Sequence, residues 1–230
     1  MRQLIVLGGG GFSMEKNRAL DRHFLAQTRR ARPRVLFIGT ASGDGEAYRA
    51  RFYAAMRELD CRPSHLSLFQ PPARDLDAFV ARRDAIFVGG GNTRSLLALW
   101  REWRLDVILR RAYLRGTVIG GVSAGMICWF DWGVTDSIPG ALTPLRCLGW
   151  LKGSACPHYD SERARRPTFR RLVASGTVPA GFAADDGVAL HFVDGTLHDV
   201  VSARSSARAW WIDRGNGRAS ETPIVPRQIR

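Results

Sequence analysis

A serine flanked by small residues occurs in the segment Gly121-Val122-Ser123-Ala124-Gly125. The segment follows an apolar run at residues 117–122 and precedes a helical pattern, which is the strand–turn–helix context of a nucleophile elbow. Small neighbours allow a sharp turn that lifts the hydroxyl above a sheet, and the first N–H groups of the helix face a developing oxyanion. The pattern predicts that Ser123 is a nucleophile; the alternative is a serine that only caps the helix.

A nucleophilic serine needs a general base, and the sequence has five histidines. His191 and His198 alternate along the strands of a predicted hairpin. His23 lies in an early helical segment, and His65 begins a strand. His158 lies in a loop-like stretch, residues 156–160, after the elbow. Because loops at the end of a sheet commonly carry catalytic groups, we expect His158 to be the base; the alternative is a solvent-exposed histidine.

The imidazole of such a base is oriented by a carboxylate. Asp185-Asp186-Gly187 precedes a predicted strand and is the best candidate, and Asp160 is the second. An ordinary turn or cap is the alternative role for the aspartate pair. From these residues alone, the third member of the triad stays open between Asp186, Asp185 and Asp160.

A second glycine turn, Gly89-Gly90-Gly91-Asn92, ends a strand and opens a helix. Backbone N–H groups there are candidates for an oxyanion hole, and a phosphate cradle is the alternative. The spacing is not that of a P-loop, and the earlier turn at residues 8–11 lacks the G-x-G-x-x-G pattern. Nucleotide binding is therefore not expected.

The elements that must position these residues follow from apolar runs separated by helical patterns. Alternation of this kind predicts a doubly wound, mostly parallel sheet flanked by helices, in a single α/β domain over residues 1–230. Strands are predicted at residues 4–7, 35–38, 65–69, 85–88 and 117–122, and helices at 15–30, 46–59, 105–114 and 165–173. A further helix is predicted to run through residues 99–103, with Asn92 or Thr93 as its cap. The three glycine turns follow the carboxyl ends of strands, where ligands of such sheets bind.

The rest of the chain is less regular. Residues 188–193 and 197–202 flank Asp194-Gly195 and predict a β-hairpin. Residues 131–155 contain many glycines and prolines and are expected to be rich in loops. The polar tail from about residue 213 is expected to be mobile or peripheral. The short apolar N-terminal run is interpreted as the first strand rather than a targeting peptide.

The composition of the chain limits the classes of partner that we expect it to bind. The net charge is +13, but nearly all the basic residues are scattered arginines, so we expect no nucleic-acid partner and only a field that favours small anionic substrates. No apolar stretch is long enough for a membrane span. The four cysteines lack metal-binding spacing and are expected to be reduced thiols of a cytoplasmic protein.

Taken in order, Gly-Gly-Gly-Asn at 89–92, Gly-x-Ser-Ala-Gly at 121–125, Pro-His at 157–158 and Asp-Gly at 186–187 resemble the peptidase E family. This family comprises aspartyl dipeptidases and is related to the cyanophycinases. The resemblance implies a sandwich like that of class I glutamine amidotransferases. It implies Ser123 as nucleophile, His158 as base and Asp186 as third member, a position that is Glu in some relatives. It also implies that the amides of Gly91 and Ala124 form the oxyanion hole.

Family aspartyl dipeptidases bind the acidic side chain of the substrate with an arginine downstream of the histidine. Arg165 matches by spacing, Arg166 is close behind, and Asn92 is a further expected substrate contact. Asp160 and Glu162 depart from that pattern. The resemblance thus predicts a cytoplasmic serine peptidase, a monomer or homodimer without metal or cofactor, that cuts short peptides, including dipeptides with N-terminal Asp. The alternatives are a cyanophycinase-like isopeptide or ester hydrolase and a non-enzymatic anion-binding protein.

Overall fold

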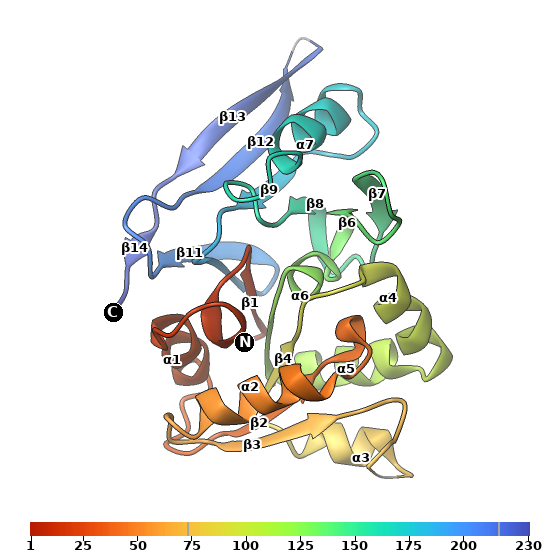
Figure 1. Ribbon diagram of the computed structural model, residues 1–230, viewed down its shortest axis with the longest axis vertical. Helices are drawn as coiled ribbons and strands as arrows, with labels where there is room; N and C mark the ends of the chain where they lie inside the picture. The colour runs from red at the N-terminus through yellow and green to blue at the C-terminus, as the bar shows by residue number, and fades with distance from the viewer. Residues whose placement is uncertain (73, 216) are drawn as a thin grey trace.

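The computed structural model describes residues 1–72, 74–215 and 217–230 and contains two sheets (Figure 1). The larger sheet has eight strands in the order β14-β11-β10-β1-β5-β4-β2-β3. Its strands are β1 (Gln3–Leu7), β2 (Arg34–Ile38), β3 (Arg62–Leu66), β4 (Ala85–Val88), β5 (Val118–Val122), β10 (Val188–Val193), β11 (Thr196–Ser202) and β14 (Arg227–Gln228). Five neighbouring strands pair in parallel, in the spatial order β1, β5, β4, β2 and β3. Strand β10 pairs with β1 and with β11 in antiparallel fashion.

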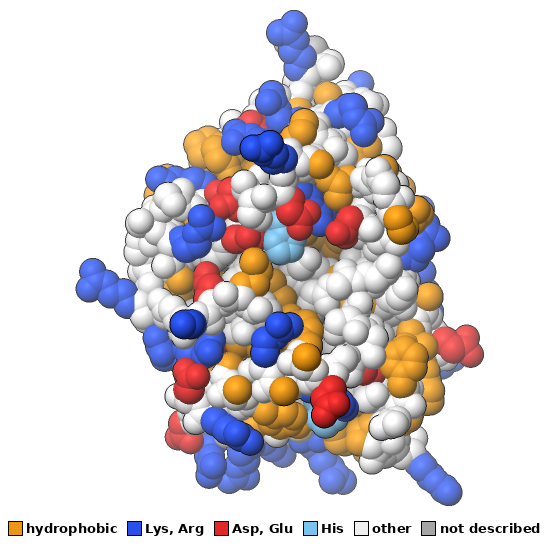
Figure 2. All heavy atoms as spheres, in the orientation of Figure 1, with side chains coloured by type: hydrophobic (Ala, Val, Ile, Leu, Met, Phe, Trp, Pro, Cys, Tyr) orange, Lys and Arg blue, Asp and Glu red, His pale blue; other side chains and the backbone are white. Residues whose placement is uncertain are grey.

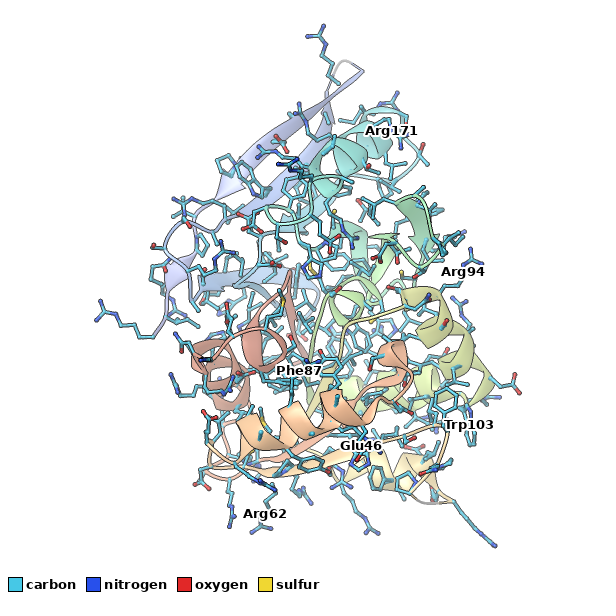
Figure 3. All side chains as sticks on the ribbon, in the orientation of Figure 1. Glu46, Arg62, Phe87, Arg94, Trp103 and Arg171 are labelled. Atoms are coloured by element: carbon cyan, nitrogen blue, oxygen red, sulfur yellow. The ribbon has the colours of Figure 1, made fainter. Side chains whose placement is uncertain are left out.

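Helices cover both faces of this sheet, which explains why its central strands are continuous apolar runs. On one face lie α1 (Ala19–Ala26) and α2 (Glu46–Met56), whose side chains pack with Phe87 of β4 (Figure 3). Residues from α3 (Leu76–Ala81), α4 (Thr93–Glu102) and α5 (Leu105–Leu114) belong to the other layer of the core, with Trp100 fully buried. The predicted doubly wound α/β architecture is confirmed.

The second sheet has six strands in the order β13-β12-β9-β8-β6-β7 and occupies the upper part of Figure 1. Its strands are β6 (Phe130–Thr135), β7 (Thr143–Arg146), β8 (Leu151–Cys156), β9 (Gly181–Ala184), β12 (Ala209–Gly215) and β13 (Arg218–Ile224). Helix α7 (Arg165–Ala174) packs against β12 and β13. Pairing in this sheet is mixed, with β6, β8 and β9 parallel.

The expectation of loops over residues 131–155 was wrong, because this region supplies three strands of the second sheet. Its glycines mark close packing as well as turns. At Gly133 in β6, a Cβ would lie 2.8 Å from Ile127, so the small residue lets the strand pack on the helix after the elbow. The polar tail after Asp213 is also structured: it completes β12 and forms β13 and β14.

Several element boundaries differ from the predicted ones. The strand predicted at 65–69 is β3, which begins three residues earlier at Arg62, and the helix predicted at 15–30 is the shorter α1. The predicted cap of the helix before Trp103 is confirmed, because α4 begins at Thr93 with Asn92 as its N-cap. The predicted hairpin around Asp194-Gly195 is confirmed as β10 and β11. All four cysteines carry free thiols, as predicted. Within the described residues, no helix is long and apolar enough to cross a membrane.

Candidate active site

Ser123 lies at the end of β5, immediately before the short helix α6 (Ala124–Ile127). Its backbone has φ 58° and ψ −109°, a region that residues with a side chain rarely occupy. Glycines on either side make the turn possible: a Cβ at Gly125 would lie 2.2 Å from the carbonyl oxygen of Val88, and one at Gly121 would lie 2.5 Å from that of Gly125. The strained turn between a strand and a helix and the close approach of β4 are features that the predicted nucleophile elbow requires.

Two backbone N–H groups beside Ser123 are candidates for an oxyanion hole. Gly90 approaches the serine so closely that a Cβ there would lie 3.2 Å from Ser123 Cβ and 3.7 Å from its Oγ. The next residue, Gly91, has φ 133°, and its N–H has no hydrogen-bond partner among the described residues. The N–H of Ala124, the first residue of α6, is likewise without a partner in the described chain. These are the two amides that the family resemblance implies.

His158 follows β8 and also has a positive φ, 52°. Its Nδ1 lies 2.7 Å from Oδ1 of Asp186. Because an ionised carboxylate only accepts hydrogen bonds, Nδ1 carries the proton and Nε2 is left as the basic nitrogen. Gly9 provides the space for this pair, since a Cβ there would lie 1.9 Å from Asp186 Oδ1 and 3.0 Å from His158 Nδ1.

Ser123 and His158 approach the same end of β1 from two sides. The Ser123 N–H donates to the carbonyl oxygen of Leu7 at 3.1 Å, and Gly9, two residues further, forms a parallel bridge with Asp186. No hydrogen bond joins the Ser123 hydroxyl to His158 in this structure. A general base must come within hydrogen-bond reach of the proton that it takes, so the role of His158 as the base of Ser123 stays a prediction.

Asp186 is the carboxylate that contacts the imidazole. Burial of its side chain raises its pKa, but the hydrogen bond with His158 and the charge of Arg204 oppose this effect, and the pKa lies below its ordinary value of 3.8. The two alternatives have other partners. Asp160 Oδ1 accepts a hydrogen bond from the Asp186 N–H at 2.9 Å, and Asp185 accepts from the Arg208 N–H at 2.8 Å.

The predicted substrate-binding arginines are both bound to carboxylates of the chain itself. Arg165 is 2% exposed; its Nε donates to Glu162 Oε2 at 2.7 Å, and its Nη1 donates to the carbonyl oxygen of Val134 at 2.8 Å. Arg166 donates to Glu221 of β13, with its Nη2 at 2.9 Å from Oε2. A substrate carboxylate at either arginine would have Glu162 or Glu221 as a competitor, and the substrate-binding role of both arginines stays a prediction.

Asn92 acts as the N-cap of α4. Its Oδ1 accepts from the Ser95 N–H at 2.9 Å, while its Nδ2 donates to the carbonyl oxygen of Ser137, after β6, at 3.0 Å. The amide therefore ties the glycine turn to the second sheet. Its predicted contact with substrate stays a prediction, and one amide hydrogen remains for it.

Sequence reasoning missed Arg204, in the connection between β11 and β12. Its Nη1 lies 2.9 Å from Asp160 Oδ2 and 2.8 Å from the carbonyl oxygen of Asp186. It also missed Glu15, whose Oε2 accepts from the Gly11 N–H at 3.1 Å and whose pKa is raised, mainly by burial. Neither residue belongs to a local motif, so no signal in the sequence marks them.

Acidic side chains gather around a histidine near the centre of the face shown in Figure 2. Glu162 is part of the turn that follows His158, since its N–H donates to the His158 carbonyl oxygen at 3.1 Å. A carboxylate on a substrate would meet these acids unless an arginine receives it. In the part of the chain that the structure describes, no group of three or more His, Cys, Asp or Glu side chains could hold a metal ion.

Known proteins resemble this chain in sequence and in fold. A Bacillus subtilis (strain 168) protein described as an uncharacterized peptidase, YgaJ, is 53% identical over 225 residues, which is 97% of each chain. Two solved structures share the fold at 17% identity. A peptidase from an acI-B1 Actinobacterium has a TM-score of 0.71, with 100% of this chain and 96% of that one covered. A candidate peptidase E protein from Listeria monocytogenes EGD-e has a TM-score of 0.59, with 97% and 99% covered. The predicted resemblance to peptidase E is confirmed, and because the profile of peptidase family S51 matches residues 4–200, the chain belongs to that family.

Proposed function

We propose that this protein is a serine peptidase that hydrolyses short peptides through an acyl-enzyme. The observation that carries the proposal is the surroundings of Ser123. The serine lies on a strained turn, with the free N–H groups of Gly91 and Ala124 beside it and with His158 and Asp186 across the end of β1. Nucleophile, base, orienting carboxylate and oxyanion donors are the groups that acyl transfer requires.

In the proposed mechanism, Ser123 Oγ attacks the scissile carbonyl carbon while His158 Nε2 takes the hydroxyl proton. The carbonyl oxygen becomes an oxyanion and accepts hydrogen bonds from Gly91 and Ala124. His158 then gives its proton to the leaving amine, and the acyl-enzyme forms. Water then attacks the acyl carbon while His158 takes its proton, and His158 returns that proton to Ser123 Oγ as the acid product leaves. Asp186 keeps Nδ1 protonated throughout and stabilises the imidazolium.

A more specific version of the proposal concerns dipeptides with N-terminal Asp. The family resemblance favours it, and Arg165 is the buried cation that would receive the aspartate side chain. Glu162 is paired with this guanidinium in the structure. An acidic substrate must therefore compete with Glu162, so Glu162 limits any preference for Asp.

Labelling with a fluorophosphonate tests the serine mechanism without knowledge of the substrate. Wild type should be labelled at one serine and should cut at least one of a panel of short peptides. Ser123→Ala should lose the label and lose hydrolysis by about 10⁴-fold, because triad chemistry depends on the nucleophile. Ser206→Ala, which replaces an exposed serine, is the matched control and should behave as wild type.

Normal hydrolysis by Ser123→Ala would contradict the proposal. A protein that binds anions but is neither labelled nor active would support the non-enzymatic alternative. Including isopeptides and small esters in the panel separates a peptidase from an isopeptide or ester hydrolase.

A further inference from the structure

Arg204 lies outside the proposed triad but contacts the residue that carries its carboxylate. One nitrogen, Nη1, donates to the backbone carbonyl oxygen of Asp186 at 2.8 Å and to Oδ2 of Asp160 at 2.9 Å. The side chain of Arg204 is 42% exposed, so the contact lies at the edge of the site and not in the core.

Asp160 holds the opposite side of the same residue. Its Oδ1 accepts a hydrogen bond from the Asp186 N–H at 2.9 Å, while its Oδ2 bonds to Arg204. Both polar groups of the Asp186 backbone are therefore held by side chains, and those two side chains form an ion pair with each other. Asp160 is two residues after His158, so the same pair also links the histidine loop to the Asp186 segment.

The local backbone is shaped to receive this arginine. A Cβ at Gly187 would lie 2.7 Å from Arg204 Cδ, so only glycine lets the side chain pass so close to the Asp186 segment. The Arg204 N–H donates to the buried Ser202 hydroxyl at 3.0 Å, and the Ala203 N–H donates to the Gly187 carbonyl oxygen at 3.1 Å. These two bonds hold the backbone around Arg204 beside the segment that contains Asp186.

We infer that Arg204 and Asp160 are a positioning pair that fixes the Asp186 peptide so that its carboxylate meets His158 Nδ1. This inference rests on the proposed serine mechanism. Neither residue reaches the reacting atoms; each acts through Asp186. A displacement of about 1 Å in a catalytic group lowers rates by about 100-fold, whereas a half-exposed ion pair adds little to stability. The pair therefore matters more for turnover than for folding.

A role in substrate binding predicts a different kinetic signature. If Arg204 bound the substrate in the ground state, its loss would raise KM and leave kcat largely unchanged. If it positions Asp186, its loss lowers kcat and the rate of serine labelling, with little change in KM. The labelling rate is informative because a small fluorophosphonate tests the activation of Ser123 without any peptide contact.

The experiment compares wild type with Arg204→Met, Arg204→Lys, Asp160→Asn and Asp160→Ala. The measurements are the second-order rate of fluorophosphonate labelling, kcat and KM on a peptide that wild type cuts, and the melting temperature. The matched control is Arg208→Met in the same connection, because the hydrogen bonds that its side chain makes to the described residues go to the nearby carbonyl oxygens of Ser205 and Ala207.

Arg204→Met and Asp160→Ala should each lower kcat and labelling by about 10- to 100-fold, with KM within about three-fold and only a small change in melting temperature. Arg204→Lys should recover part of the loss, because an ammonium group restores the charge and one donor. Asp160→Asn should lose less than Asp160→Ala, since an amide oxygen still accepts from the Asp186 N–H. The double variant Arg204→Met with Asp160→Ala should be no worse than the poorer single variant.

Labelling of Arg204→Met and Asp160→Ala at the wild-type rate would overturn the inference, and so would an effect confined to KM. If Arg204→Met does not fold, Asp160→Ala provides the test, because alanine removes both the acceptor for the Asp186 N–H and the partner of Arg204. Wild-type kcat and labelling would overturn the positioning role, and a reduced kcat at normal KM would support it. Failure of the underlying proposal looks different, because wild type itself would then not be labelled at Ser123.

Discussion

Replacement of Glu162 by glutamine should increase the preference for an N-terminal aspartate. In the wild-type protein, the Glu162 carboxylate lies 2.7 Å from Nε of Arg165, and Asp136 is a more distant neighbour at 3.7 Å from Nη2. The bond between Arg165 and the Val134 carbonyl oxygen is independent of Glu162 and should persist. Glutamine keeps the shape of the side chain but removes its charge, so a carboxylate on the substrate becomes the stronger partner for the guanidinium.

The expected change in substrate preference can be estimated from the solvent exposure of Glu162. A hydrogen bond between charged groups contributes about 1.5–3 kcal/mol when water is excluded. Glu162 is 45% exposed although Arg165 is 2% exposed, so solvent screening reduces the competition that it offers to about 1 kcal/mol. A difference of about 1 kcal/mol corresponds to about five-fold in kcat/KM.

The assay is the ratio of kcat/KM for Asp-Leu to that for Asn-Leu, two dipeptides that differ mainly in charge. This ratio should rise about five-fold in Glu162→Gln and stay unchanged in Glu46→Gln, an exposed residue of α2 that is remote from the site (Figure 3). It should fall in Arg165→Lys, because an ammonium group cannot form the bidentate pair. A ratio that is unchanged or lower in Glu162→Gln would refute the competition between Glu162 and the substrate.

Two further predictions concern the fold that holds the site. Gly125→Ala places a Cβ 2.2 Å from the Val88 carbonyl oxygen. It should lower the free energy of unfolding, measured by urea titration, by about 1–3 kcal/mol and should slow the labelling of Ser123. Wild-type stability and labelling would contradict the packing argument. Asp21 is buried, and burial raises the pKa of its carboxyl to about 6. The stability that the protonated carboxyl contributes is therefore fully present below the pKa of the unfolded chain and is lost as the pH rises through about 6. Asp21→Asn should therefore gain about 1–3 kcal/mol relative to wild type between pH 4 and pH 7, and a constant difference would refute this assignment.

Local patterns in the sequence were sufficient for the first sheet, apart from the two-residue edge strand β14, and for the glycine turns at its strand ends. The strands β1 and β4 are short apolar runs followed by glycines, and β5 contains Gly120 and Gly121 before it reaches Ser123. Apolar composition is what a strand buried on both faces requires. Parallel strands place their carboxyl ends at one edge, so the three glycine turns were expected to meet there. The approach of Gly90 to Ser123, and of Gly9 to Asp186, agrees with that expectation.

The second sheet was not predictable from local patterns, because its strands depend on their neighbours. Strand β13 is polar along its length and partly exposed, and it is stabilised by pairing with β12 and by contacts of Glu221 with Tyr159 and Arg166. Arg204 is a similar case. It is 44 residues from Asp160 in the chain, and only the folded arrangement of β11 and β12 brings the two side chains together.

The choice between Asp185 and Asp186 shows what the fold adds to the motif. Consecutive residues of an extended segment point to opposite sides, so only one of the two carboxylates can face the histidine. Asp185 points toward Trp210, whose Nε1 donates to it at 3.3 Å, which leaves Asp186 to face His158. The deciding contact is the bridge between Asp186 and Gly9, because a residue with a side chain at position 9 would occupy the space of the Asp186 carboxylate. The glycine turn after β1, which contains no catalytic group, therefore determines which aspartate reaches the imidazole.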